Sequence, residues 1–221
     1  MSQQRQKLAE QLAEAVAQAL SEDLDRQERV LLVVSGGSTP VPFFKALAAK
    51  PLAWSRIDIT LADERWVDET SRDSNARLVR ENLLQGAAAA ARFVPLTAEA
   101  STPEEGVAAV AEQTASLSWP ASVVILGMGG DGHTASLFPD SQELGLALST
   151  DEPLVAVRTP SQPQPRITFS ASRLHQAHRH ILHITGDDKR AVLANALNGD
   201  DVRQLPIRAF LSCPLAIYWA P

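Results

Sequence analysis

Short apolar segments rich in β-branched residues alternate with amphipathic segments along this chain, which restricts the fold more than any other feature. Strands are predicted at residues 29–34, 57–62, 122–126, 154–157, 166–169, 180–185 and 215–219. Helices are predicted at residues 7–20, 41–49, 74–84, 104–117 and 189–197. This alternation favours an α/β fold with a mainly parallel sheet covered on both faces. We expect a single domain over residues 1–221.

Composition is that of an ordinary globular protein and excludes several functional classes. Hydrophobic residues make up 45% and charged residues 21% of the chain, which argues against disorder. The net charge of −6 gives no general attraction to nucleic acid or to a membrane, so neither partner is expected. The single cysteine, Cys213, is expected to be a buried structural thiol. No membrane-length segment or signal-peptide core is present, so we expect a cytoplasmic location.

The glycine-rich segment Gly127–Pro139 directly follows the strand predicted at 122–126 and indicates a catalytic loop. Glycine lets the backbone approach a ligand closely, and His133 is suited to moving a proton near neutral pH. Asp131 stands two residues earlier, where its carboxylate can orient the imidazole. The glycine spacing also matches the dinucleotide fingerprint. However, Pro139 would end a helix that began at His133 within two turns, so nucleotide binding is disfavoured.

Three polar motifs, Ser35–Pro40, Asp63–Arg65 and Gly127–His133, each follow a predicted strand. In an open parallel sheet the loops after the strands emerge at one edge, so we expect these motifs to converge there. The first motif opens a helix, with Pro40 predicted at the first helical position. Its N–H groups would suit a phosphate, although a plain turn capped by Thr39 would have the same pattern.

Three basic residues stand near the ends of strands or the start of a helix: Arg65, Arg166 and Lys189. Either guanidinium could bind a phosphate through two hydrogen bonds, and Lys189 would add a point charge near a helix N-terminus. Each residue alone would more often be a solvated surface charge. Together, beside a glycine turn, they favour a phosphorylated substrate.

Other groups of residues in the sequence give weaker evidence for a functional site. Four histidines suggest a metal cluster: His175, His178, His180 and His183. However, they straddle a helix end and a strand, His180 and His183 should point to opposite faces, and no cysteine partner is expected. We therefore predict no metal site. No G-x-S-x-G motif is present, so a serine hydrolase of the α/β-hydrolase type is unsupported.

Several motifs together resemble the glucosamine-6-phosphate isomerase/6-phosphogluconolactonase family. They are Ser35–Pro40, Ala62–Val67, Ser74–Asn75, Gly127–Pro139, Pro165–Thr168, Gly186–Lys189 and the last strand with Trp219. The resemblance covers almost the whole chain. It implies a Rossmann-like three-layer α/β/α fold with a mainly parallel sheet, as in the glucosamine-6-phosphate deaminase/ribose-5-phosphate isomerase group.

Two residues favour the lactonase branch of this family. Phe138 stands where the deaminases carry an acid for ring opening, and Arg65 stands where they carry an aromatic residue. Pro221 ends the chain where lactonases often have an acidic residue, a departure that we expect to matter little. Two alternatives stay open: a sugar-phosphate deaminase or isomerase on the same scaffold, and a non-catalytic sugar-phosphate sensor.

The resemblance implies hydrolysis of 6-phospho-D-glucono-1,5-lactone to 6-phospho-D-gluconate in the oxidative pentose phosphate pathway, by a monomer without cofactor or metal. His133 would activate water, Asp131 would hold the imidazole, and Arg65 or a glycine-loop N–H would stabilise the oxyanion. Asp63 would brace the loops or bind a sugar hydroxyl. The other substrate-binding residues would be Gly36, Gly37, Ser38, Thr39, Gly130, Arg166 and Lys189.

Overall fold

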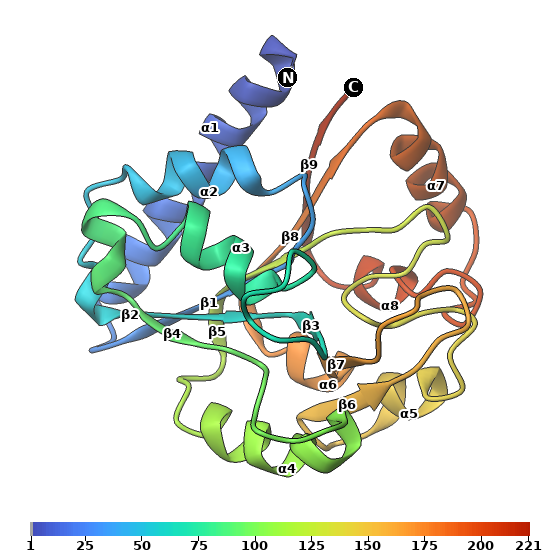
Figure 1. The fold of residues 1–221 in the computed structure, drawn as a ribbon. Coiled ribbons are helices and arrows are strands. Elements are labelled where there is room, and N and C mark those ends of the chain that lie inside the picture. Colours follow the sequence, from blue (N-terminus) through green and yellow to red (C-terminus); the bar gives the residue numbers. More distant parts are fainter. Residues whose placement is uncertain (1) are drawn as a thin grey trace.

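A six-stranded sheet forms the centre of the protein in the computed structural model, which describes residues 2–221 (Figure 1). The strand order is β4-β2-β1-β5-β8-β9, and every neighbouring pair is parallel. The strands are β1 (Val30–Val34), β2 (Ile57–Leu61), β4 (Arg92–Val94), β5 (Ala121–Leu126), β8 (Ala177–Thr185) and β9 (Leu215–Ala220). The predicted parallel sheet is confirmed.

A second, antiparallel sheet has the order β3-β7-β6 and stands apart from the main one. Its strands are β3 (Asp63–Arg65), β6 (Leu154–Val157) and β7 (Arg166–Phe169). The strands predicted at 154–157 and 166–169 therefore exist but lie outside the main sheet. The link between them is shorter than the dozen or more residues that a parallel crossover needs, so they pair as a hairpin.

Helices follow most strands of the main sheet, as the alternation predicted. They are α1 (Gln3–Leu24), α2 (Val41–Ala48), α3 (Asn75–Asn82), α4 (Pro103–Thr114), α5 (Leu144–Ser149), α6 (Ala171–Leu174), α7 (Asp187–Leu197) and α8 (Arg208–Leu211). Short 3₁₀ turns occur at Trp54–Arg56 and Gly86–Ala90. Pro40 occupies the N-cap of α2, one position before that predicted, and Pro42 lies within the first turn.

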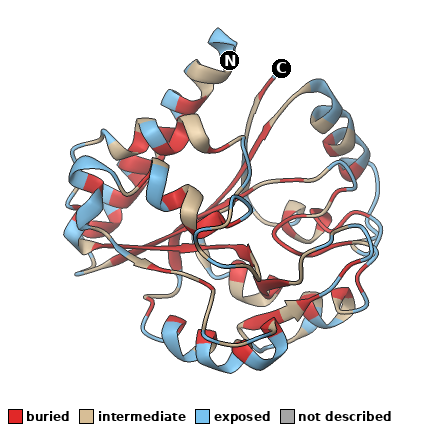
Figure 2. Ribbon diagram, viewed as in Figure 1, coloured by how far each residue is buried: buried red, intermediate tan, exposed pale blue. Residues whose placement is uncertain are grey.

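The core lies between the main sheet and the inner faces of the helices (Figure 2). Every residue of β1, β2 and β5 is buried, as expected for strands covered on both faces. On β8, His183 packs against Phe43 of α2, whereas His180 lies near Phe210 of α8. Because these histidines are an odd number of residues apart, they point to opposite faces, and helices therefore cover both faces of the sheet.

Charge inside this core is compensated by ion pairs. The fully buried Asp58 of β2 pairs with Arg29 and Arg92, each at 2.6 Å. Burial alone would raise the pKa of the Asp58 carboxyl, but hydrogen bonds from the two arginines lower it overall. Within residues 2–221, no helix combines the length and apolar character needed to cross a bilayer.

The expectation that the histidines lack a cysteine partner was wrong. Cys213 is only partly buried, and it lies beside His175 and His180. The reason is topological: β9 pairs with β8, with Leu215 opposite His180. The turn before β9 therefore brings Cys213 to a place that its sequence distance from the histidines does not suggest.

Candidate active site

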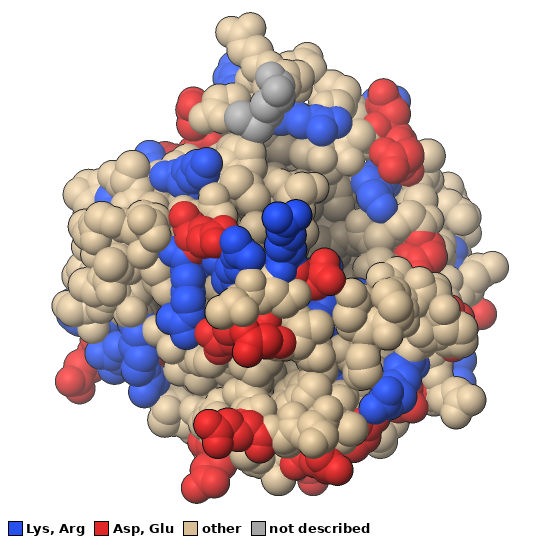
Figure 3. Space-filling model, viewed as in Figure 1, with Lys and Arg blue, Asp and Glu red and all other residues tan. Residues whose placement is uncertain are grey.

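A cavity of about 290 Å³ opens where β1, β2, β5 and β8 end at the carboxyl edge of the sheet. The predicted convergence of the strand-end motifs is confirmed there, since β2 and β5 flank β1. The predicted residues that line the cavity are Gly36, Gly37, Ser38, Thr39, Asp63, Arg65, His133, Arg166 and Lys189. Asp131 and Gly130 are exposed and lie outside this lining. Figure 3 shows a hollow on this face with basic side chains beside it.

Asp131 and His133 form a hydrogen-bonded pair at the rim of the cavity. Asp131 Oδ1 lies 2.5 Å from His133 Nδ1 and also accepts the backbone N–H of His133 at 3.1 Å. Partial burial raises the pKa of the Asp131 carboxyl, but the hydrogen bond to His133 lowers it overall. The carboxylate can only accept a hydrogen bond, so Nδ1 carries the proton and Nε2 is the imidazole nitrogen with a free lone pair.

The glycine loop packs tightly around this pair. A Cβ at Gly129 would collide with the His133 ring and with the Asp131 carboxylate, so only glycine fits there. The Gly129 N–H donates to the backbone oxygen of His133 at 2.8 Å, and the Gly132 N–H donates to that of Gly129 at 3.2 Å. The Gly127 N–H is bonded to Ser35 Oγ. These three N–H groups are therefore occupied within the protein.

Arg65 and Arg166 face each other directly across the antiparallel strands β3 and β7. Both line the cavity, and the Nε atoms of both are buried without a hydrogen-bond partner in the part of the chain that the structure describes. Burial lowers the pKa of the Arg166 guanidinium, although the Asp63 carboxylate 3.6 Å away opposes the effect. Two adjacent guanidinium groups that line one cavity form a strong site for an anion.

Asp63 and Asn75 hold the arginines in place. The Ser136 hydroxyl donates to Asp63 Oδ2 at 2.6 Å, which links β3 to the glycine-rich segment. Asn75 accepts a hydrogen bond from Arg65 Nη1 at 2.7 Å and donates one to the backbone oxygen of Asp63 at 2.9 Å. Sequence reasoning did not assign a role in the site to Asn75, although it lines the cavity. The Ser74–Asn75 motif was the available signal.

The turn Gly36–Thr39 forms the wall beside α2. A Cβ at Gly36 would collide with the Asn75 amide, which explains the glycine, and Gly37 has a positive φ of 91°. No side chain among residues 2–221 caps α2, so the alternative of a turn capped by Thr39 is not what the structure shows. In the first turn of α2, Pro42 has no N–H and neither Val41 nor Phe43 lines the cavity, so contacts to an anion on this wall would come from the Gly36–Thr39 turn itself.

Lys189 reaches the cavity from the first turn of α7, which Gly186 precedes. Its amine comes close to Gly130, since a Cβ on that glycine would lie 3.6 Å from Lys189 Nζ. Lys189 forms no ion pair with any residue of the described range 2–221. It is therefore a free positive charge at the mouth of the cavity.

Two aromatic residues shape the inner part of the site. Phe138 is buried, with its ring 4.3 Å from that of His133 and 5.3 Å from the Arg166 guanidinium carbon. His183 lines the cavity but is 4% exposed, and burial lowers its pKa from 6.5 to about 4. Sequence reasoning did not place His183 in the site, because the strand pattern gives its face but not which helix ends beside it.

Comparison with known proteins agrees with this geometry. The family model for glucosamine-6-phosphate isomerases/6-phosphogluconolactonase matches residues 3–219. The chain belongs to this family. Within it, the chain is 47% identical to a 6-phosphogluconolactonase from Pseudomonas aeruginosa, over 95% of this chain and 89% of that protein.

Solved structures agree with the family assignment. The crystal structure of a 6-phosphogluconolactonase from Shewanella baltica matches this family member with a TM-score of 0.97 and 44% identity, over 98% of this chain and 94% of that one. A monomeric glucosamine-6-phosphate deaminase matches with a TM-score of 0.79 at 17% identity, over 97% of this chain and 93% of that one, and so shares the fold alone. The three-layer α/β/α architecture is confirmed.

Proposed function

We propose that this family member hydrolyses 6-phospho-D-glucono-1,5-lactone to 6-phospho-D-gluconate, in the oxidative pentose phosphate pathway. The observation that carries the proposal is one cavity that joins His133, which is hydrogen-bonded to Asp131, to the guanidinium groups of Arg65 and Arg166. The relatives named as 6-phosphogluconolactonases support the same conclusion. The Asp131–His133 pair would activate water, and the two arginines would bind anionic oxygen.

In the proposed reaction, His133 Nε2 accepts a proton from water as the water oxygen attacks the lactone carbonyl carbon. Asp131 stabilises the resulting imidazolium through Nδ1. The tetrahedral intermediate then collapses, the bond from the carbonyl carbon to the ring oxygen breaks, and His133 returns the proton to that oxygen. Because a lactone is an activated ester, a covalent nucleophile is not required.

Arg65 is the proposed donor to the developing oxyanion. The N–H groups of Gly127, Gly129 and Gly132 are already hydrogen-bonded within the protein, whereas Arg65 lines the cavity and its buried Nε has no hydrogen-bond partner within residues 2–221. The phosphate would lie against the Gly36–Thr39 turn, Arg166 and Lys189. Asp63 would act as a brace rather than a proton carrier, because Ser136 and Arg166 occupy its carboxylate.

The deaminase alternative is weaker because Phe138, which packs on the His133 ring, cannot carry a proton. Residues 1–221 are proposed to form one domain with a complete site, acting as a monomer in the cytoplasm.

The test is the hydrolysis rate of freshly generated 6-phosphogluconolactone above its spontaneous background, for the wild type and for His133→Ala. General base catalysis contributes about 10²–10⁴-fold, so the variant should lose activity by that factor and keep its circular dichroism spectrum. Glucosamine 6-phosphate serves as the control substrate. Ammonia release from it without lactone turnover would show a deaminase, and binding without turnover of either compound would show a sensor.

A further inference from the structure

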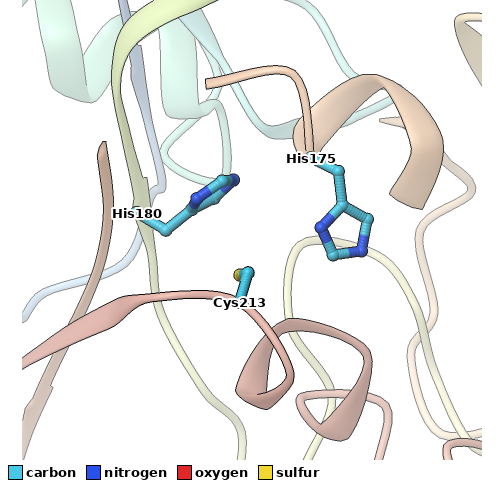
Figure 4. Close-up of side chains that lie close together, drawn as sticks. All are labelled: His175, His180 and Cys213. Atoms are coloured by element: carbon cyan, nitrogen blue, oxygen red, sulfur yellow. The ribbon is translucent and has the colours of Figure 1, made fainter. Parts of the chain in front are cut away.

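A second group of chemically reactive side chains lies away from the cavity. His175 follows α6, His180 lies within β8, and Cys213 stands between α8 and β9. One potential ligand atom from each lies within 4.8 Å of the other two. Figure 4 shows the two imidazole rings and the thiol arranged around a common space.

The hydrogen bonding of His180 suits a metal ligand. His180 Nε2 lies 3.0 Å from the backbone oxygen of Leu174. A carbonyl oxygen can only accept a hydrogen bond, so Nε2 carries the proton and Nδ1 keeps the lone pair. Histidine ligands of metals usually have their second ring nitrogen bound in this way, which sets the tautomer and the ring orientation.

Phe210 of α8 holds all three side chains in position. The His175 ring stacks on the Phe210 ring at 4.6 Å, and the His180 ring lies 6.3 Å from it. The Cys213 thiol donates to the backbone oxygen of Phe210 at 3.0 Å. Phe210 itself is fully buried, so the cluster rests on a rigid part of the core.

Two neutral imidazoles and one thiolate form a donor set that suits zinc. Cys213 would release to solvent the thiol proton that it donates to the Phe210 backbone oxygen when the ion binds. Zinc binds nitrogen at about 2.0–2.1 Å and sulfur at about 2.3 Å, so tetrahedral ligand atoms lie roughly 3.3–3.6 Å apart. The observed separations of up to 4.8 Å therefore require shifts of about 1 Å. His175 is exposed, which opens the cluster to solvent and to a water molecule as fourth ligand.

We propose that His175, His180 and Cys213 bind one Zn²⁺ ion, with water in the fourth position, and that the ion ties the α6–β8 turn to the α8–β9 turn. The site is separate from the catalytic cavity. Thr185 lines that cavity, and His180 lies five residues earlier on β8, about 16 Å along the strand. The ion would stabilise the fold rather than contact the substrate.

The test is a titration of the metal-free, full-length protein with Co²⁺, which replaces Zn²⁺ and is visible by absorption. The expected result is one Co²⁺ per chain, with a thiolate-to-cobalt charge-transfer band that added Zn²⁺ removes. Cys213 is the only cysteine, so such a band can arise from no other residue. This measurement on the wild type holds even if a variant fails to fold.

Variants then assign the remaining ligands. Cys213→Ser and His175→Ala should each weaken Zn²⁺ binding by about 100-fold or more, and Zn²⁺ should raise the melting temperature of the wild type but not of these variants. His178→Ala is the matched control, because His178 pairs with Asp23 outside the cluster and its loss should leave binding unchanged. Absence of the thiolate band, one metal per two chains, or unchanged affinity in Cys213→Ser would overturn the proposal.

Discussion

The guanidinium groups of Arg65 and Arg166 lie on opposing positions of β3 and β7, where like charges repel. Asp63 offsets part of this repulsion, and Asn75 orients Arg65. The buried Nε atoms of both arginines have no hydrogen-bond partner within residues 2–221. An arrangement of this kind is stabilised when an anion binds, so substrate binding and the local structure should support each other.

Lys189→Met tests the third positive charge at the residue scale. The variant keeps an unbranched side chain but removes a charge with no acidic partner in the described chain, so folding should be little affected. Losing a charge-assisted hydrogen bond to phosphate costs ~1.5–3 kcal/mol, which is about 10- to 150-fold in KM for the lactone. The catalytic rate constant should change much less.

Steady-state kinetics of lactone hydrolysis separates these two effects. Lys45→Met is the control, because Lys45 is an exposed lysine on α2 that does not line the cavity. If KM rose equally in both variants, or stayed unchanged in Lys189→Met, Lys189 would not bind the phosphate.

At the scale of elements, Glu64 of β3 anchors the start of α3. Its buried carboxylate accepts hydrogen bonds from the backbone N–H groups of Asn75 and Ala76 at 2.8 and 2.7 Å and from the Ser74 hydroxyl at 3.2 Å. It also accepts the backbone N–H of Arg65 at 2.8 Å. Burial raises the pKa of the Glu64 carboxyl, even though these hydrogen bonds oppose the rise. The carboxylate fixes α3, and α3 in turn presents Asn75 to Arg65.

Glu64→Gln should therefore destabilise the protein despite its nearly identical shape. Both carboxylate oxygens accept N–H or O–H donors, so an amide NH₂ would face another donor and leave it unpaired. The expected loss is about 1–3 kcal/mol in the free energy of unfolding, measured with urea. Glu81→Gln removes an exposed pair with Arg77 on the same helix and should cost less than about 0.5 kcal/mol. Equal losses in the two variants would contradict the anchoring role.

At the scale of the whole molecule, one buried histidine links global stability to pH. The pKa of His183 is about 4 in the folded protein, against an ordinary value of 6.5. Between these values the unfolded chain binds a proton that the folded chain does not, so stability falls as pH falls from 6.5 to 4. A shift of this size corresponds to roughly 3 kcal/mol.

Urea unfolding at pH 7 and pH 4 measures this contribution. His183→Leu replaces the imidazole with an apolar side chain of similar size and so removes the titrating group. The stability lost between the two pH values should be smaller in the variant than in the wild type by up to roughly 3 kcal/mol. An identical loss in both proteins would show that His183 does not control the acid sensitivity.

Much of this molecule follows from local information in the chain. Apolar runs such as those at β1 and β5 specify buried strands, and the alternation with helices specifies a parallel sheet. Since strand ends in such a sheet share an edge, the convergence of the Gly36–Thr39 turn, Arg65 and His133 was predictable. The Asp131–His133 pair was predictable for a simpler reason, because its residues are two positions apart.

The tertiary structure alone decided which distant side chains meet. Helix α3 places Asn75 against Arg65, and the hairpin of β6 and β7 leaves the main sheet to bring Arg166 opposite Arg65. The turn before β9 brings Cys213 to the histidines at the other end of β8. Periodicity tells which face of a strand a residue occupies. It does not tell which loop packs on that face, because that depends on the path of the whole chain and on how its core is filled.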